Sequence, residues 1–254
     1  MRLEFLPWPE VERVREEKNL LLVPVGATEQ HGPHLPINTD TVIGERLCWA
    51  ASEKTGVAVA PGMAYSVSAG HTPKWAGTFT VGHEAFLAVV RDFTAWAVAT
   101  GWKRVVFLNA HLGNDAALRV AVDQLRVKFL GRLQIGVWNS FTLGEGIWDE
   151  FRSDAEDLHA NRGETDLMLY LSPETVRMEA VVDDEDRTGG TVFSYPVAQT
   201  SLNGVTGRPS EGTADAGEAL FGKMVGALVD KLERALVEEP PLPEGEWEGY
   251  DFEF

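Results

Sequence analysis

The sequence is short of cysteine, of long apolar runs and of basic residues, and each shortage excludes a class of protein. Its 254 residues include one cysteine, Cys48, so an internal disulfide framework is ruled out and a buried thiol in a reducing cytoplasm is expected. No stretch approaches the roughly 18 uninterrupted apolar residues of a membrane-spanning helix. Residues 1–19 also lack the apolar core and cleavage site of a signal peptide, so we expect a cytoplasmic protein without a membrane partner.

Basic residues are outnumbered by acidic ones. The 22 Lys and Arg residues stand against 39 Asp and Glu residues, which gives a formal net charge of −17 at pH 7. A surface of this charge repels nucleic-acid phosphates, so no nucleic acid is expected as a partner. The remaining composition, 44% apolar and 24% charged, is that of an ordinary globular protein with a buried core.

Short apolar runs alternate with helical patterns along the chain. Strands are predicted at 19–26, 57–61, 103–111 and 133–139, and helices at 39–56, 83–101, 114–131, 163–173 and 214–237. This alternation predicts an α/β fold in which helices cover both faces of a largely parallel sheet. Because the chain has no internal repeat and no clear linker, residues 1–237 are predicted to be one domain. The acidic, aromatic tail 238–254 is expected either to be solvated or to pack on a neighbouring subunit.

Residues with metal-binding side chains follow the first and third predicted strands. They are Glu29, His31 and Asp40 in GATEQHGPHLPINTD (26–40) and His111 in NAHLGN (109–114). The carboxyl ends of parallel strands meet at one edge of a sheet, so these side chains are predicted to lie together. Imidazole and carboxylate ligands without thiolate suit zinc, manganese or iron(II). Taken alone, each histidine is more often a hydrogen-bonded residue than a ligand, and Asp40 alone could be a helix N-cap.

Longer motifs in the chain resemble the creatininase (creatinine amidohydrolase) family. They are VGATEQHGPHLPINTD (25–40), NAHLGN (109–114) and HANRGETDLML (159–169), supported by GHTPKWAGTFT (70–80) and GVTGRPSEGTADAG (204–217). The resemblance extends over residues 20–232 and implies a three-layer α/β/α fold and a homohexamer. It also implies a binuclear centre with two divalent metal ions (Zn, Mn or Fe) per subunit. The implied reaction is hydrolysis of a C–N bond in a small polar amide, lactam or formamide, the last including that of a pyrimidine nucleotide.

The resemblance assigns roles to individual residues. It implies metal ligation by Glu29, His31, Asp40, His111 and Glu164, with Asp40 as the bridge between the ions. His159 matches the catalytic histidine, and Glu164 is also a candidate catalytic base. In the implied mechanism, metal-activated water attacks the amide carbonyl and His159 donates a proton to the leaving nitrogen.

Other residues in or near these motifs are candidate substrate contacts. They are His34, His71, Trp75 and Arg162. Arg162 could clamp a carboxylate or phosphate of the substrate, or it could form a surface ion pair instead. Gly113 and Ala155 stand where creatininase itself has a glutamate and a tryptophan, which argues against creatinine as the substrate.

Two other functions stay open at this point. An isomerase or lyase could use the same metals to stabilise an enolate, and an isomerase would conserve the mass of its substrate. A non-catalytic binding protein would account for Asn161 and Arg162, which replace a glycine and, commonly, an acid of the family's third motif.

Overall fold

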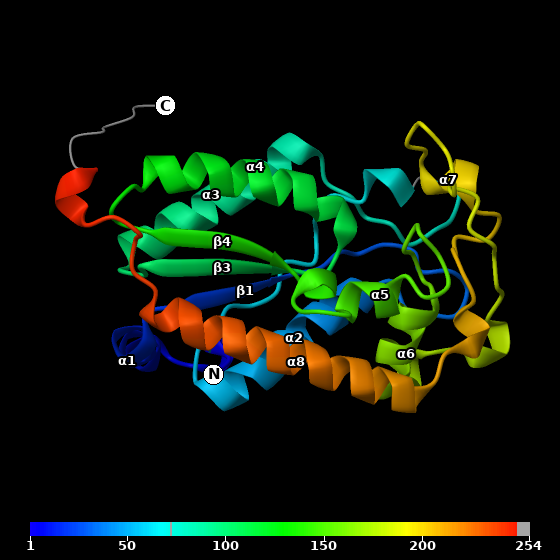
Figure 1. Cartoon of the computed structure of the whole chain (residues 1–254), viewed down its shortest axis with the longest axis horizontal. Helices are drawn as coiled ribbons and strands as arrows, with labels where there is room; N and C mark the ends of the chain where they lie inside the picture. Colours follow the sequence, from blue (N-terminus) through cyan, green and yellow to red (C-terminus); the bar gives the residue numbers. More distant parts are fainter. Residues whose placement is uncertain (72, 248–254) are drawn as a thin grey trace.

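Four parallel strands form the sheet at the centre of the protein (Figure 1). The computed structural model describes residues 1–71 and 73–247. The strands, in the order β2-β1-β3-β4, are β1 (Leu21–Val25), β2 (Ala58–Val59), β3 (Arg104–Asn109) and β4 (Gln134–Asn139). All three pairings between neighbouring strands are parallel, which confirms the predicted sheet.

Helices cover the two faces of this sheet. They are α1 (Trp8–Lys18), α2 (Thr39–Thr55), α3 (His83–Ala99), α4 (Asp115–Lys128), α5 (Ile147–Phe151), α6 (Arg162–Leu171), α7 (Val197–Thr200) and α8 (Ala214–Val237). Successive strand side chains point to opposite faces. Leu22 and Leu108 therefore pack in the core with α2 and α8, whereas Val23 and Phe107 pack in the core with α3 and α4. The three-layer α/β/α fold is confirmed (Figure 1).

Local signals explain why most predicted boundaries agree with the structure. Gly56, in the left-handed conformation with φ 71°, ends α2, and only glycine adopts this φ at little cost. The hydroxyl of Thr213 accepts a hydrogen bond from the Ala216 N–H at 3.3 Å and begins α8. No sequence pattern predicts α1, α5 or α7. In α1 only Val14 is buried, so the helix has no apolar periodicity to detect.

The end of the chain returns to the sheet after α8. Gln134 Nε2 and Arg104 Nη2 donate hydrogen bonds to the carbonyl oxygen of Glu238 at 3.0 and 3.2 Å. Trp247 lies against Gly131 of the same chain. The aromatic residues 250, 252 and 254 of the tail, expected either to be solvated or to pack on another subunit, lie outside the described residues. The division into one domain and a tail stays a prediction.

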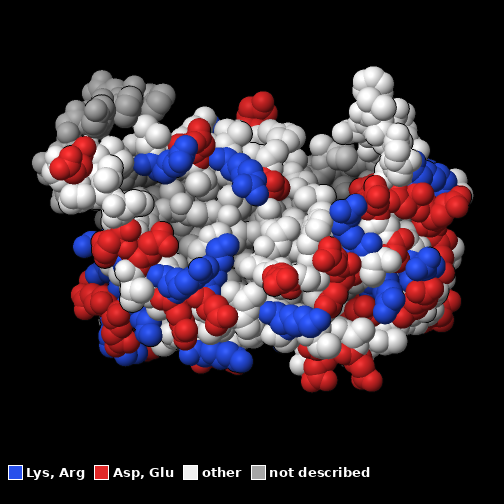
Figure 2. All heavy atoms as spheres, viewed as in Figure 1, with Lys and Arg blue, Asp and Glu red and all other residues white. Residues whose placement is uncertain are grey.

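The surface carries the excess of acidic residues that the composition requires. Figure 2 shows Asp and Glu side chains gathered densely at the end of the molecule that carries α6 and α7. An uncharged loop projects from the same end (Figure 2), where residues 188–207 include no charged side chain. Within the described part of the chain, no helix is both long enough and apolar enough to span a membrane.

Candidate active site

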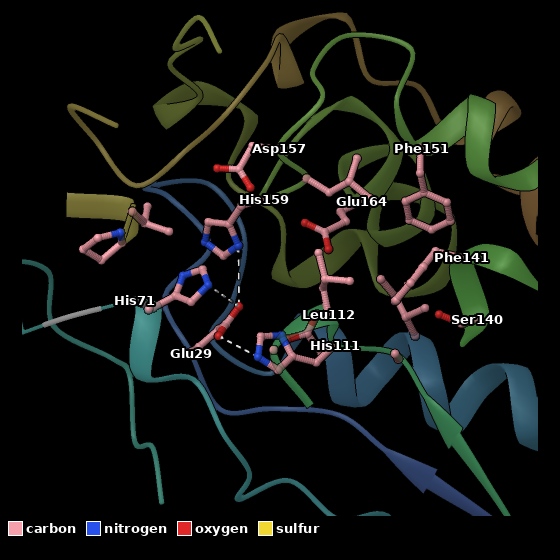
Figure 3. A pocket seen from close by; sticks show the side chains of 18 of the residues that line it. Glu29, His71, His111, Leu112, Ser140, Phe141, Phe151, Asp157, His159 and Glu164 are labelled. Carbon is pink, nitrogen blue, oxygen red and sulfur yellow. Dashed lines mark ion pairs between the residues drawn. The ribbon is translucent and has the colours of Figure 1, made fainter. Parts of the chain in front are cut away.

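Four segments bring the predicted ligands and the predicted catalytic histidine to the carboxyl edge of the sheet. They are the loop after β1 with Glu29 and His31, the first turn of α2 with Asp40, the loop after β3 with His111, and the start of α6 with His159 and Glu164. Figure 3 shows side chains from these segments converging on one cavity. A Cβ at Gly26 would lie 2.5 Å from the backbone of Thr41, so this glycine lets the first loop turn back against α2.

Asp40 lies at the centre of the cluster. Its Oδ1 is 3.4 Å from His31 Nε2, and its Oδ2 is 3.3 Å from His111 Nδ1. Glu29 Oε2 is 3.3 Å from His111 Nε2, and Glu164 Oε2 is 3.8 Å from His31 Nε2. The N-cap alternative for Asp40 is wrong, because Asn38 occupies the N-cap position of α2 and Asp40 lies inside the first turn.

The donor atoms of this cluster fit divalent cations. Three overlapping sets each place their possible ligand atoms within 4.8 Å of one another: Glu29–Asp40–His111, His31–Asp40–Glu164 and Glu29–His31–His159. Among the described residues, Glu29 Oε2, His31 Nε2 and Asp40 Oδ2 are buried without a hydrogen-bond partner. Buried polar atoms of this kind are costly unless something binds them. The Nδ1–H of His31 donates to the carbonyl of Glu29 at 3.1 Å, which leaves Nε2 free to bind a metal ion.

The carboxylates and imidazoles shift one another's pKa. Burial lowers the pKa of His31, but the carboxylates of Asp40 and Glu164 outweigh it and raise the pKa to about 10. Burial also lowers the pKa of His111, but the carboxylates of Glu29 and Asp40 outweigh it and raise the pKa to about 9. Burial raises the pKa of Glu29 to about 7, whereas the imidazoles of His31 and His111 hold the pKa of Asp40 below its usual range despite burial. The site therefore favours positive charge, as a cation-binding cluster must.

His159 is held by Gln30, a buried residue that the sequence analysis does not identify. The Nε2–H of His159 donates to the carbonyl oxygen of Gln30 at 2.7 Å. The side-chain amide of Gln30 donates to the carbonyl of Gly204 at 3.2 Å and so fixes this loop. His159 Nδ1 faces the cluster, 3.5 Å from Glu29 Oε1, and burial lowers the pKa of His159 well below its usual value. The position of Gln30 between two predicted ligands is the signal that could have identified it.

The cluster forms one wall of a pocket of about 440 Å³. The polar wall consists of Glu29, Asp40, His71, His111, Asp157, His159 and Glu164, and the other walls include Ile43, Leu112, Ser140, Phe141, Phe151 and residues 194–197. None of the lining residues in the described structure is lysine or arginine. Ser140, Asp157 and residues 194–197 are not predicted from the sequence, since neither a motif nor a periodic pattern marks them.

One buried carboxylate fastens the segment that contributes residues 194–197, which we call the rim segment (181–207). Asp184 Oδ2 accepts hydrogen bonds from the Leu202 N–H at 2.7 Å and the Ser201 hydroxyl at 2.9 Å. Its Oδ1 forms an ion pair with Arg187 Nη1 at 2.8 Å. The rim segment is therefore anchored near both of its ends while its middle projects into solvent (Figure 1).

The comparison with known proteins now decides the family. The sequence model of the creatininase (creatinine amidohydrolase) family matches residues 4–232. The chain is 34% identical over 234 residues to a mycofactocin precursor peptide peptidase of Mycobacterium ulcerans (strain Agy99), covering 84% of each protein. The chain belongs to the creatininase family.

Further members of the creatininase family agree with this assignment. A creatinine amidohydrolase of Pseudomonas putida is 27% identical over 247 residues, which cover 89% of this chain and 94% of the relative. Two solved structures, a mutant creatininase of Zn–Zn type and one titled Creatininase Mn, each align with a TM-score of 0.80 and 25% identity. Each alignment covers 93% of this chain. It covers 98% of the Zn–Zn structure and 99% of the Mn structure. The predicted assignment to metal-dependent amidohydrolases of this family is confirmed.

Two predicted substrate contacts of this creatininase-family chain lie at the cluster. His71 lines the pocket, with Nε2 at 3.5 Å from Glu29 Oε1 and its ring centroid 4.1 Å from that of His159. His34 does not line the pocket; its Nε2–H donates to the hydroxyl of Thr165 at 2.9 Å and so ties the first loop to α6. Burial lowers the pKa of His34 to about 4 and that of His71 to about 3, so both rings are neutral at pH 7.

The other two predicted substrate contacts lie outside the pocket lining. The ring centroid of Trp75 is 4.5 Å from Lys74 Nζ, and Trp75 does not reach the pocket wall. The guanidinium of Arg162 forms ion pairs of 3.8 Å with Asp166 and with Glu211. This geometry favours the ion-pair alternative for Arg162, and substrate binding by either residue stays a prediction.

Asn161, the departure from the family motif, has a structural role. Its Oδ1 accepts a hydrogen bond from the Glu164 N–H at 3.3 Å and caps α6. Its Nδ2 donates to Asp154 Oδ1 at 2.9 Å. The N–H of Ala160 donates to Glu164 Oε2 at 2.6 Å, so the altered motif still directs Glu164 toward the cluster.

Proposed function

We propose that the protein hydrolyses the C–N bond of a small amide that has an apolar group and no net negative charge. The pocket carries this proposal. One of its walls bears carboxylates and imidazoles, the opposite walls are mostly apolar, and no lysine or arginine lines it in the described residues. Substrates with phosphate groups are bound in most enzymes by such cationic side chains. A formamide of a nucleotide is therefore disfavoured against a lactam, a simple amide or a short peptide.

Two divalent cations, zinc, manganese or iron, are proposed as cofactors. Glu29, His31, Asp40, His111 and Glu164 would hold them, and Asp40 suits the bridging position because its two oxygens face different histidines. The zinc and manganese forms of solved creatininases support the first two metals. When bound, the cations would activate a water molecule and polarise the substrate carbonyl.

His159 is proposed to move the proton. Its Nε2–H is engaged by the Gln30 carbonyl, so Nδ1 is the atom that can accept a proton. Nδ1 takes this proton from the attacking water and returns it to the leaving nitrogen as the C–N bond breaks. The histidine thus acts first as a base and then as an acid, which refines the role implied by the sequence. Glu29, 3.5 Å from Nδ1, stabilises the protonated ring between the two transfers.

The names of the relatives support an amide substrate without a phosphate group. One is a peptide peptidase and another acts on creatinine, and neither reaction requires a phosphate group. The non-catalytic alternative depends on the altered motif around Asn161, and the capping role of Asn161 removes that support.

We further propose a homohexamer in the cytoplasm. The exposed aromatic side chains of Trp8 and Trp96, 75% and 72% exposed, support contacts between subunits. The single cysteine is buried and unpaired, which suits a reducing compartment. Light scattering after size-exclusion chromatography tests the hexamer directly: a monomer at micromolar concentration would contradict it.

The reaction is tested with protein purified without a chelator or a histidine tag. A panel of lactams, formamides, simple amides and dipeptides is incubated with chelator-treated protein and with the same protein reloaded with zinc or manganese. We expect an amine to form from at least one member without net negative charge, and only after reloading. Reloaded protein that hydrolyses no member, or hydrolysis that is unchanged by the chelator, would overturn the proposal.

A further inference from the structure

Asp157 differs from the other carboxylates of the pocket because its carboxylate has no partner among the described residues. Glu29, Asp40 and Glu164 each have an imidazole nitrogen within 4.0 Å. In the described residues no hydrogen bond or ion pair engages the Asp157 carboxylate, although it lines the pocket beside His159 (Figure 3). Because this half-buried carboxylate faces the pocket with none of its acceptor capacity used by the described residues, a charged donor of a ligand can bind it.

No positive charge from the described residues compensates Asp157. The neighbouring Asp186 is itself an acid, and its Oδ2 accepts hydrogen bonds from the N–H groups of Glu156 and Asp157 at 2.7 and 3.2 Å. Lysine and arginine are absent from the pocket lining that the structure describes. Among the described residues none supplies a positive charge to this carboxylate, so a cationic group of a ligand can pair with it.

A second polar group of the pocket lacks a partner as well. The hydroxyl of Ser140, at the carboxyl end of β4, lines the same pocket and belongs to a residue that is 1% exposed. No hydrogen-bond partner for this hydroxyl exists among the described residues. Two polar groups without partners in one cavity indicate a ligand with its own polar groups, not an apolar one.

We propose that Asp157 is a specificity-determining residue that binds a cationic nitrogen group, an ammonium or a guanidinium, on the amine side of the substrate. Asp157 lies beside His159 (Figure 3), and His159 is proposed to pass the proton to the leaving nitrogen. The group that Asp157 binds is therefore expected on the amine side of the scissile bond. The apolar side chains of Phe141 and Phe151 then receive the acyl side. The orientation of the substrate in this inference rests on the proposed amide hydrolysis. The preference of Asp157 for a cationic group does not depend on that reaction.

The test uses benzamides in matched pairs. Each compound is a benzamide whose amide nitrogen carries an alkyl chain of two to five methylenes. The chain ends in an ammonium group in one member of the pair and in a methyl group in the other. Binding to the chelator-treated protein is measured by calorimetry, so that no turnover is required. We expect the wild type to prefer the cationic member of at least one pair by about tenfold, the usual effect of one hydrogen-bonded charge, and Asp157→Asn to abolish the preference. Hydrolysis of the same pairs by the metal-loaded enzyme should show the same preference in KM.

A matched control separates this contact from the general attraction of cations to an acidic protein. Glu156→Gln removes the same charge one residue earlier, where the side chain is exposed and lies near Arg152. This variant should keep the wild-type preference. Equal affinity for both members of every pair in the wild type, or a preference that survives Asp157→Asn, would overturn the proposal. A preference in binding without any hydrolysis would contradict the proposed function and leave the role of Asp157 standing.

Discussion

The first loop (26–40) and the rim segment (181–207) both reach the pocket, but they are built in opposite ways. The first loop buries polar residues, Glu29, His31 and Asp40 among them, at 1% exposure each, and every one of them faces another site residue. The rim segment exposes apolar side chains, with Val192 89% and Phe193 74% exposed. Groups that do chemistry need many fixed contacts, whereas groups that admit a substrate need few. The comparison indicates that the first loop carries reacting groups, whereas the rim segment offers the substrate apolar contacts.

Loss of the Asp40 carboxylate, which belongs to two of the possible ligand sets, should have the largest effect on metal binding and activity. Asp40→Asn is expected to empty the metal site and lower kcat/KM roughly 10³-fold or more, because bound metal supplies several kcal/mol of transition-state stabilisation. Metal content by plasma mass spectrometry and amide hydrolysis measure the two losses. Asp123→Asn, on the exposed side of α4, is the matched control and should keep both. Full metal occupancy in Asp40→Asn would refute the bridging role.

Replacement of His159, the residue proposed to move the proton, should separate chemistry from metal binding. His159→Gln is expected to lower kcat by roughly 10² to 10⁴-fold, the usual contribution of general acid–base catalysis, with metal content unchanged. Single-turnover kinetics and mass spectrometry on the same preparation test this, with His83→Gln at the exposed start of α3 as the control. Loss of metal from His159→Gln would instead make His159 a ligand.

A change in the rim segment should alter substrate binding and leave the chemistry intact. Tyr195 lines the pocket and is 47% exposed, so Tyr195→Ala removes part of an apolar contact. We expect a rise in KM for apolar amides of about threefold to tenfold, from about 1 kcal/mol of lost burial, with kcat unchanged. Val192→Ala, in the same segment but outside the pocket lining, is the control. A drop in kcat without a change in KM would contradict the role of the rim segment as a source of apolar contacts.

Asp184, which anchors the rim segment, should contribute to the free energy of unfolding, and this contribution should depend on pH. Burial alone would raise the pKa of Asp184, but hydrogen bonds from the Leu202 N–H, Arg187 and Ser201 outweigh it and lower the pKa. Such a carboxylate stabilises the fold above the ordinary carboxyl pKa, and the contribution is lost as the pH falls through its folded-state pKa.

Asp184→Asn is accordingly expected to reduce the free energy of unfolding by about 1–2 kcal/mol at pH 7 and by less below about pH 4. Urea unfolding at several pH values measures this, with the exposed Glu185→Gln as the control. A difference between wild type and variant that does not change with pH would show that charge is not the cause.

The sequence predicts the first loop well because its chemistry is visible in residue types. Carboxylates and imidazoles at strand ends are rare enough to mark a site, and parallel topology brings Glu29, Asp40 and His111 together without knowledge of side-chain directions. The helices whose apolar faces repeat regularly are predicted for the same reason, and α1, with Val14 as its only buried residue, is not.

The rim segment could not be predicted in this way. Between Arg187 and Arg208 it has no charged residue, and its position over the pocket depends on the long-range anchor at Asp184. Trp75 and Arg162 show the same limit. Both are close in sequence to site motifs, but the direction of a loop or helix-terminal side chain is decided by tertiary contacts such as the ion pair of Arg162 with Glu211.

The most direct test of the central claim is the metal content of the wild-type chain. Protein purified without chelators, or reloaded with zinc or manganese and freed of excess metal, is analysed by plasma mass spectrometry. The arrangement of the buried cluster predicts about two ions per chain, and fewer than one in Asp40→Asn. A wild-type protein that contains no metal and takes up neither zinc nor manganese would contradict the assignment of residues 29, 31, 40, 111 and 164 as a metal centre.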